Sequence, residues 1–132
     1  MKLNHNRFKT SSIVILLGLI TNCSSLSLNP GAEKVQLSHS KADKTCQFLG
    51  TVFANQGNAF TGGFTSNANL QEGAFNDLRN KGYAMGGNYI QIIANQAGVT
   101  GSGGGDLSGF GSRSQQTNYT VTGSVFKCPR VD

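Results

Sequence analysis

The chain has 132 residues, a formal net charge of +5 at pH 7, 37% hydrophobic residues, 18 glycines and three cysteines. This length suits one small domain and is too short for two. Three of the 11 Lys and Arg residues and none of the six Asp and Glu residues precede Cys23, so removal of that segment would lower the net charge to +2. The sequence then shows no basic patch of the kind that a nucleic-acid-binding domain needs.

An apolar run, Ile13–Ile20, follows a short basic segment that contains Lys2, Arg7 and Lys9. This order is typical of a secretory signal peptide. The run is far shorter than the roughly 20 apolar residues that span a bilayer. We therefore expect this segment to direct export and to be cleaved.

The cleavage site is predicted from the residues that follow the apolar run. The first alanine of the chain is Ala32, so an ordinary A-x-A signal-peptidase site is missing near the run. The sequence Ile20-Thr-Asn-Cys23 resembles a bacterial lipobox, although Asn22 stands where Gly, Ala or Ser is usual. We predict that residues 1–22 are a lipoprotein signal peptide and that Cys23 carries the acyl chains, palmitate among them. An uncleaved membrane anchor and cleavage at another position are the alternatives.

The residues after Cys23 predict where the mature protein is held. Ser24 follows the cysteine, where an aspartate would favour retention in the inner membrane by the sorting rule of bacterial lipoproteins. We therefore expect an anchor in the outer membrane and a domain in the periplasm. Residues 24–31 are small, polar and contain Pro30, which predicts a flexible tether of at most about 28 Å. Residues 32–132 form the single domain.

Cys46 and Cys128 remain after Cys23 is assigned to lipidation. Disulfides persist in the oxidising compartment that an exported chain enters. We predict a bridge between the two cysteines, and buried free thiols are the alternative.

Two β-strands are expected in the first half of the domain. A short alternation of apolar and polar residues over 32–38 indicates a first strand, and the β-favouring residues of 45–54 indicate a second. The turn-prone sequence of 55–58 ends the second strand, and Gly57–Ser66 reads as a loop.

A helix is predicted to begin at Asn69, which as N-cap would pair with Glu72 in a capping box. Its core-facing side would carry Ala74, Leu78, Gly82 and Met85. Gly82 indicates a close approach to a sheet, because glycine is unfavourable inside a helix.

The helix is expected to end at Gly86-Gly87, which supplies a left-handed stop. On its exposed side Asp77 and Lys81 stand four residues apart and can form an ion pair.

A strand over 88–94 completes a strand-helix-strand unit, whose two strands normally run parallel. The Gly- and Ser-rich residues 98–116 predict a mobile hairpin loop, and 118–128 reads as a last strand close to Cys46. The expected fold is an α/β (α+β) domain with one main helix on a small mixed sheet of three to four strands.

Three segments resemble a family of small proteobacterial lipoproteins of unknown function: Cys46–Val52, Gly73–Lys81 with Gly86–Asn88, and Gly123–Cys128. That family is distantly similar to RcsF, the outer-membrane lipoprotein that senses envelope damage for the Rcs phosphorelay. The resemblance covers roughly residues 35–128 and implies an α/β domain with a Cys46–Cys128 bridge. It also implies a location in the cell envelope.

Residues with catalytic potential do not form a known constellation in the sequence. His39 is the only histidine of the mature chain, and Glu72 and Asp77 lie on different sides of the predicted helix. The glycine-rich segment that ends at Asp106 lacks the Lys-Ser/Thr of a P-loop and the repeats of a calcium-binding β-roll. No cofactor and no metal site are expected. Tyr83, Tyr89 and Tyr119 could line a recognition surface or be partly buried in the sheet.

We therefore expect a non-enzymatic, membrane-anchored binding or envelope-maintenance module with a protein or polysaccharide partner. Two alternatives stay open. One is a stress-sensing input to a signalling relay, and the other is a small cell-wall hydrolase that acts through Glu72 or Asp77.

Overall fold

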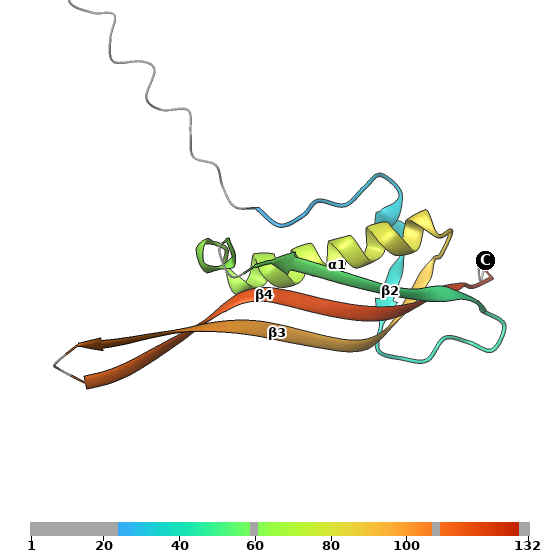
Figure 1. Ribbon diagram of the computed structural model, residues 1–132. Coiled ribbons are helices and arrows are strands. Elements are labelled where there is room, and N and C mark those ends of the chain that lie inside the picture. Colours follow the sequence, from blue (N-terminus) through green and yellow to red (C-terminus); the bar gives the residue numbers. More distant parts are fainter. Residues whose placement is uncertain (1–23, 59–60, 107–108, 130–132) are drawn as a thin grey trace, which may run out of the picture.

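The computed structural model describes residues 24–58, 61–106 and 109–129. One long helix, α1 (Asn67–Ala84), lies on a sheet, and two short 3₁₀ turns flank it in the sequence (Figure 1). The 3₁₀ turns are η1 (Ala32–Lys34) and η2 (Gly62–Phe64), and the strands are β1 (Gln36–Ser38), β2 (Gln47–Gly57), β3 (Tyr89–Asp106) and β4 (Gly109–Lys127). This arrangement confirms the predicted α+β class.

The four strands lie in the order β1-β3-β4-β2. β4 is antiparallel to both of its neighbours, and β1 is parallel to β3. β2 and β3 therefore run in the same direction, as the strand-helix-strand unit predicts, but β4 lies between them. The last strand of the chain thus occupies the centre of the sheet.

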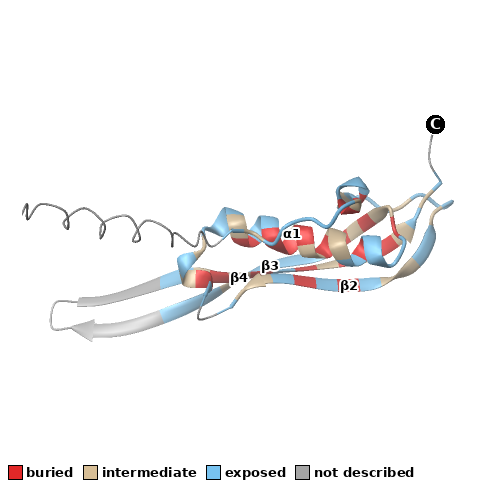
Figure 2. Ribbon diagram, turned by 90° about the horizontal axis from the view of Figure 1, so that it is seen from above, coloured by how far each residue is buried: buried red, intermediate tan, exposed pale blue. Residues whose placement is uncertain are grey.

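The core lies between α1 and one face of the sheet (Figure 2). Apolar residues at helical spacing face the strands, and alternate residues of the strands point back at them. The largest fully buried side chains are Leu70 and Leu78 of the helix with Ile90, Val121 and Val125 of the sheet. Because burying such a side chain contributes about 1.5–3 kcal/mol, this single layer of contacts holds the helix in place.

Two glycines allow the helix and sheet to pack closely around Ile90. A Cβ atom at Gly82 would lie 2.5 Å from Ile90 Cδ1, and one at Gly123 would lie 2.4 Å from Ile90 Cγ2. Real side chains do not approach this closely. The expectation that Gly82 marks a close approach to the sheet is confirmed.

The start of α1 differs from the prediction. The N-cap is Ser66, whose hydroxyl accepts a hydrogen bond from Asn69 N at 3.2 Å, so the helix begins one turn before the predicted cap. Both Ser66 and Asn69 are good capping residues, and the earlier one allows Leu70 to join the buried stripe. Glu72 consequently lies within the helix and closes no capping box.

The end of α1 confirms the predicted glycine stop. Gly86 has a φ of 83°, and the amides of Gly86 and Gly87 donate to the carbonyls of Tyr83 and Gly82 at 2.8 and 2.9 Å. Met85 lies past the last helical residue and is 40% exposed, so its predicted place in the core is wrong.

Several strand boundaries also differ from the expectations. The expected first strand is a 3₁₀ turn followed by only three strand residues, and β2 continues through the expected turn to Gly57. Residues of the expected mobile loop belong to strands β3 and β4, whose register continues from Thr100 opposite Gln115 to Asp106 opposite Gly109. This hairpin extends past the N-terminal start of α1 (Figure 1).

A disulfide joins Cys46 and Cys128, as predicted, and links the start of β2 to the end of β4. A tight turn leads into this bridge, because Cys46 N donates to Asp43 O at 3.0 Å. The backbone N–H and the hydroxyl of Thr45 both donate to the Asp43 carboxylate and hold its pKa below the ordinary value. The bridge closes a loop between residues 82 positions apart.

We expect the double variant Cys46→Ala/Cys128→Ala to lose up to about 4.5 kcal/mol of unfolding free energy, because the long loop is no longer closed in the unfolded chain. Urea denaturation of the full chain measures the loss. Wild-type protein with its bridge reduced serves as the control and should match the double variant. An unchanged midpoint in the double variant would contradict the expectation.

Candidate functional site

The residues considered for catalysis do not come together. His39 is exposed in the loop after β1, Glu72 is exposed on α1, and Asp77 lies on another side of α1 from Glu72. Within residues 24–58, 61–106 and 109–129 no group of three or more His, Cys, Asp or Glu residues could hold a metal ion. Cys23 lies outside the described residues.

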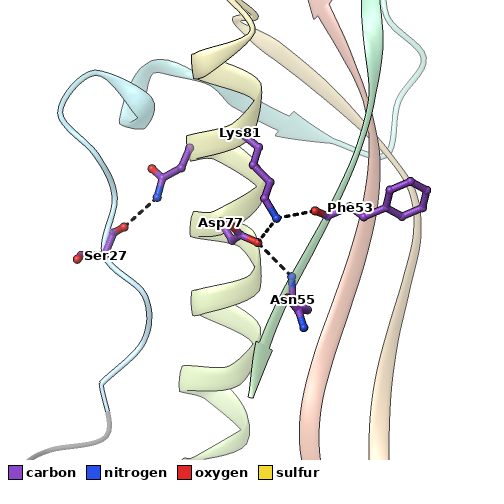
Figure 3. Close-up of polar contacts among 6 residues, drawn as sticks. Ser27, Phe53, Asn55, Asp77 and Lys81 are labelled. Carbon is purple, nitrogen blue, oxygen red and sulfur yellow. Dashed lines mark hydrogen bonds and ion pairs between the residues drawn. The ribbon is translucent and has the colours of Figure 1, made fainter. Parts of the chain in front are cut away.

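Asp77 and Lys81 form the predicted ion pair, with Lys81 Nζ 2.7 Å from Asp77 Oδ2. The pair does more than was predicted, because it also binds the backbone of β2 (Figure 3). Lys81 Nζ donates to Phe53 O at 2.8 Å, and Asn55 N donates to Asp77 Oδ2 at 3.2 Å. One carboxylate and one ammonium therefore satisfy backbone groups of the outer strand.

β2 is an edge strand, and its outer backbone groups could pair with a strand of another molecule. The contacts of Asp77 and Lys81 occupy this edge in the middle of the strand. The opposite edge strand, β1, has only three residues. Both features limit unwanted edge-to-edge pairing.

The backbone of residues 26–29 is bound to α1, and we call this segment the N-terminal strap. Asn76 Nδ2 donates to Leu26 O at 2.8 Å, Asn80 Nδ2 donates to Ser27 O at 3.0 Å, and Asn29 N donates to Asn80 Oδ1 at 2.8 Å. The Asn76 side chain is only 6% exposed. Figure 1 shows the segment on the side of the helix that is turned away from the sheet.

The strap changes the predicted picture of a flexible tether over residues 24–31. Most of that segment is fixed, because Gly31 N also donates to Glu33 Oε2 and Ala32 N donates to Asn29 O. Leu26 follows Cys23 by three positions, which corresponds to about 10 Å of fully extended chain. Any anchor at Cys23 would therefore hold the domain by a short link.

The face of the sheet opposite α1 has no helix over it. Side chains along each strand alternate between the core and this surface, apart from bulges near Gly50, Ile93 and Val99. We call this surface the open face; it carries Gln36, Ser38, Phe48, Thr51, Phe53, Asn55, Tyr89, Gln91, Ile93, Thr120, Thr122, Ser124 and Phe126.

The open face combines exposed apolar groups with neutral polar ones. Phe48, Phe53 and Ile93 are 57%, 70% and 57% exposed. Phe126 stacks edge-to-face with Phe48 and with Tyr89, at centroid distances of 5.5 and 6.5 Å, so a row of rings crosses three strands. None of the strand residues that define this face is charged.

A second surface feature is a hollow of about 130 Å³ at the end of α1. It is lined by Lys34, Val35, Tyr83, Gly86, Gly87, Asn88 and Lys127. Ligand pockets are usually about 300–1,000 Å³. This hollow is too small to enclose a typical organic ligand.

The three tyrosines have different environments. Tyr119 is buried and packs against Phe75, Tyr89 is half-buried in the row of rings, and Tyr83 is 46% exposed beside the hollow. The three tyrosines therefore do not share one recognition surface, and the alternative of burial in the sheet holds for Tyr89 and Tyr119. The open face was missed because the phenylalanines of β2 and β4 are 70 or more positions apart in the sequence, and only the strand pairing brings them together.

These features define a disulfide-bridged α+β domain with an N-terminal strap and one uncovered sheet face. The chain belongs to the DUF4156 family, a domain of unknown function, whose family pattern matches residues 26–128. It is similar to the uncharacterized protein YjeI of Escherichia coli strain K12, with 33% identity over 112 residues that cover 84% of this chain and 87% of the relative.

YjeI of Shigella flexneri shows the same identity and coverage. No solved structure matches this chain significantly. Within the described part of the chain, no helix is long and apolar enough to cross a membrane.

We expect Asp77→Ala to lower the unfolding free energy by about 1 kcal/mol, because the variant loses a hydrogen-bond acceptor for Asn55 N and the partner of Lys81. It should also increase self-association, since the edge of β2 is uncovered. Glu72→Ala removes an exposed carboxylate from the same helix and is the matched control. Urea denaturation measures the unfolding free energy, and light scattering measures self-association. Equal values for Asp77→Ala and Glu72→Ala in both measurements would contradict the edge role.

We expect Asn80→Ala to release the strap, because both hydrogen bonds of the side chain are lost. Amide hydrogen exchange over residues 26–29 should become faster, while exchange in the sheet stays unchanged. Gln71→Ala, on an exposed part of α1, is the control. Unchanged exchange over the strap in Asn80→Ala would show that these bonds do not hold it.

Proposed function

We propose that this protein is a lipid-anchored, non-catalytic binding module of the bacterial cell envelope, held in the outer membrane through acylated Cys23 with its domain in the periplasm. The observation that carries the proposal is the apolar run Ile13–Ile20 that ends shortly before Cys23, behind a basic segment. The Cys46–Cys128 bridge supports it, because disulfides persist outside the cytosol.

The strap, which follows Cys23 in the sequence, supports the same proposal. It begins three residues after the cysteine and lies on the side of α1 away from the sheet. Leu26 and Leu28 are 43% and 36% exposed there. A short link and exposed leucines suit a helix side that faces the bilayer, with the open face turned away from it.

The contacts of Asp77 favour a binding role over hydrolysis of the cell wall. Its carboxylate accepts from Asn55 N and pairs with Lys81, so it is committed to holding the edge strand. A catalytic acid or base needs a carboxylate that is available to the substrate. We therefore assign Asp77 a structural role.

Cys23→Ala should abolish incorporation of a labelled fatty acid in cells and shift the protein from the membrane fraction to the soluble fraction, because the acylated thiol is removed. The double variant Cys46→Ala/Cys128→Ala is the control and should keep its label. Label that survives in Cys23→Ala would refute the lipoprotein proposal.

A further inference from the structure

We propose that the open face binds a neutral glycan strand. This inference names the binding surface of the proposed function and the chemistry of its partner. It rests on that function, because a glycan strand of the envelope is within reach only if the domain lies in the periplasm. It is argued from the exposed rings, the unpaired polar groups and the missing charge of the open face.

The exposed rings provide an apolar surface of the kind that sugars use. Phe48 and Phe53 both belong to β2, and Ile93 lies on β3 across the sheet. The C–H groups on one side of a pyranose ring are apolar and pack against aromatic rings.

Neutral polar groups lie between the apolar ones. Thr51, Ser124 and Gln91 are aligned across β2, β4 and β3, and Thr122 stands opposite Phe53. Their side chains make no hydrogen bond to another residue in the described part of the chain. Hydroxyl and amide groups both donate and accept, as the hydroxyls of a sugar do.

The charge of the surface supports a neutral partner. The strand residues that define the open face carry no ionised group, so a neutral strand could bind there without burying an unpaired charge. The strand residues of this face offer a polyanion no cation. Charged side chains, Lys41 and Lys44 among them, lie in the loop that borders the face where Tyr89 Oη donates to Ser40 O at 2.8 Å. The basic side chain of Lys127 lies instead at the hollow on the helix side.

A protein partner fits this surface less well. Protein–protein hot spots are rich in Trp, Tyr and Arg and poor in Ser and Thr. The open face has no Arg, and its β2 and β4 residues include four Ser or Thr: Thr51, Thr120, Thr122 and Ser124. Addition of a partner strand to β2 is hindered, because Phe53 O and Asn55 N already have partners. The occupant therefore contacts the exposed side chains of the face and does not pair with the backbone of β2.

Sedimentation of the full chain, purified in detergent, with protein-free peptidoglycan sacculi tests the proposal. A second arm measures by calorimetry the binding of soluble, uncharged polysaccharide released from lipopolysaccharide by mild acid, so that the two glycan sources are distinguished. Binding to either one supports the proposal and identifies the source. Binding to neither overturns it.

Variants then locate the surface. Phe53→Ala and Phe48→Ala should each weaken binding about tenfold, since each removes an exposed ring. Phe64→Ala is the matched control, because Phe64 is 83% exposed and lies in η2 outside the open face. Binding that Phe53→Ala and Phe48→Ala leave unchanged would overturn the assignment to this face.

Thr122→Val separates a glycan from an apolar protein contact. The substitution keeps the shape of the side chain and removes its hydroxyl, so binding to a glycan should weaken about fivefold. Binding that is kept or strengthened overturns the glycan assignment and indicates an apolar protein partner. The assay does not require acylated Cys23, so its result is independent of the fatty-acid labelling experiment.

Discussion

The packing of α1 on one face of the sheet is the constraint on which the rest of the structure depends. Leu70 and Leu78 lie against the strands, and Ile90 fits between Gly82 and Gly123. A helix is about 10–12 Å wide and neighbouring strands are about 4.8 Å apart, so one helix covers little more than two strands. A four-stranded sheet with a single helix is therefore left with one bare face and with edges that need other protection.

The same helix supplies that protection with its polar residues. Asp77 and Lys81 bind the edge of β2, while Asn76 and Asn80 bind the strap on the outer side. Asparagine inside a helix costs up to about 0.7 kcal/mol relative to alanine. A typical intramolecular hydrogen bond contributes about 1 kcal/mol, which offsets that cost. The polar residues of α1 are thus explained by tertiary contacts, and helix propensity alone does not account for them.

Local signals predicted the helix, its glycine stop, the close approach at Gly82 and the Cys46–Cys128 bridge. They failed where two neighbouring residues could both cap the helix, and where a segment is held by residues that are distant in the sequence. Ser66 and Asn69 are both good N-caps, and only the burial of Leu70 decides between them. The strap depends on bonds between residues about 50 positions apart, and the place of β4 in the sheet depends on long-range pairing. The glycine- and serine-rich composition of residues 98–116 predicted a mobile loop, whereas most of these residues belong to the paired strands β3 and β4.

The exposed rings of the open face contribute little to the stability of the fold, because most of the Phe53 surface stays in water. They also carry a risk, since exposed apolar groups beside a strand edge promote aggregation. A sequence under selection for folding alone could replace them with polar residues at little cost. The edge contacts of Asp77 and Lys81 reduce the risk at the strand next to these rings and leave the face itself free. Protection of the edge together with exposure of the face is the combination that a binding surface requires.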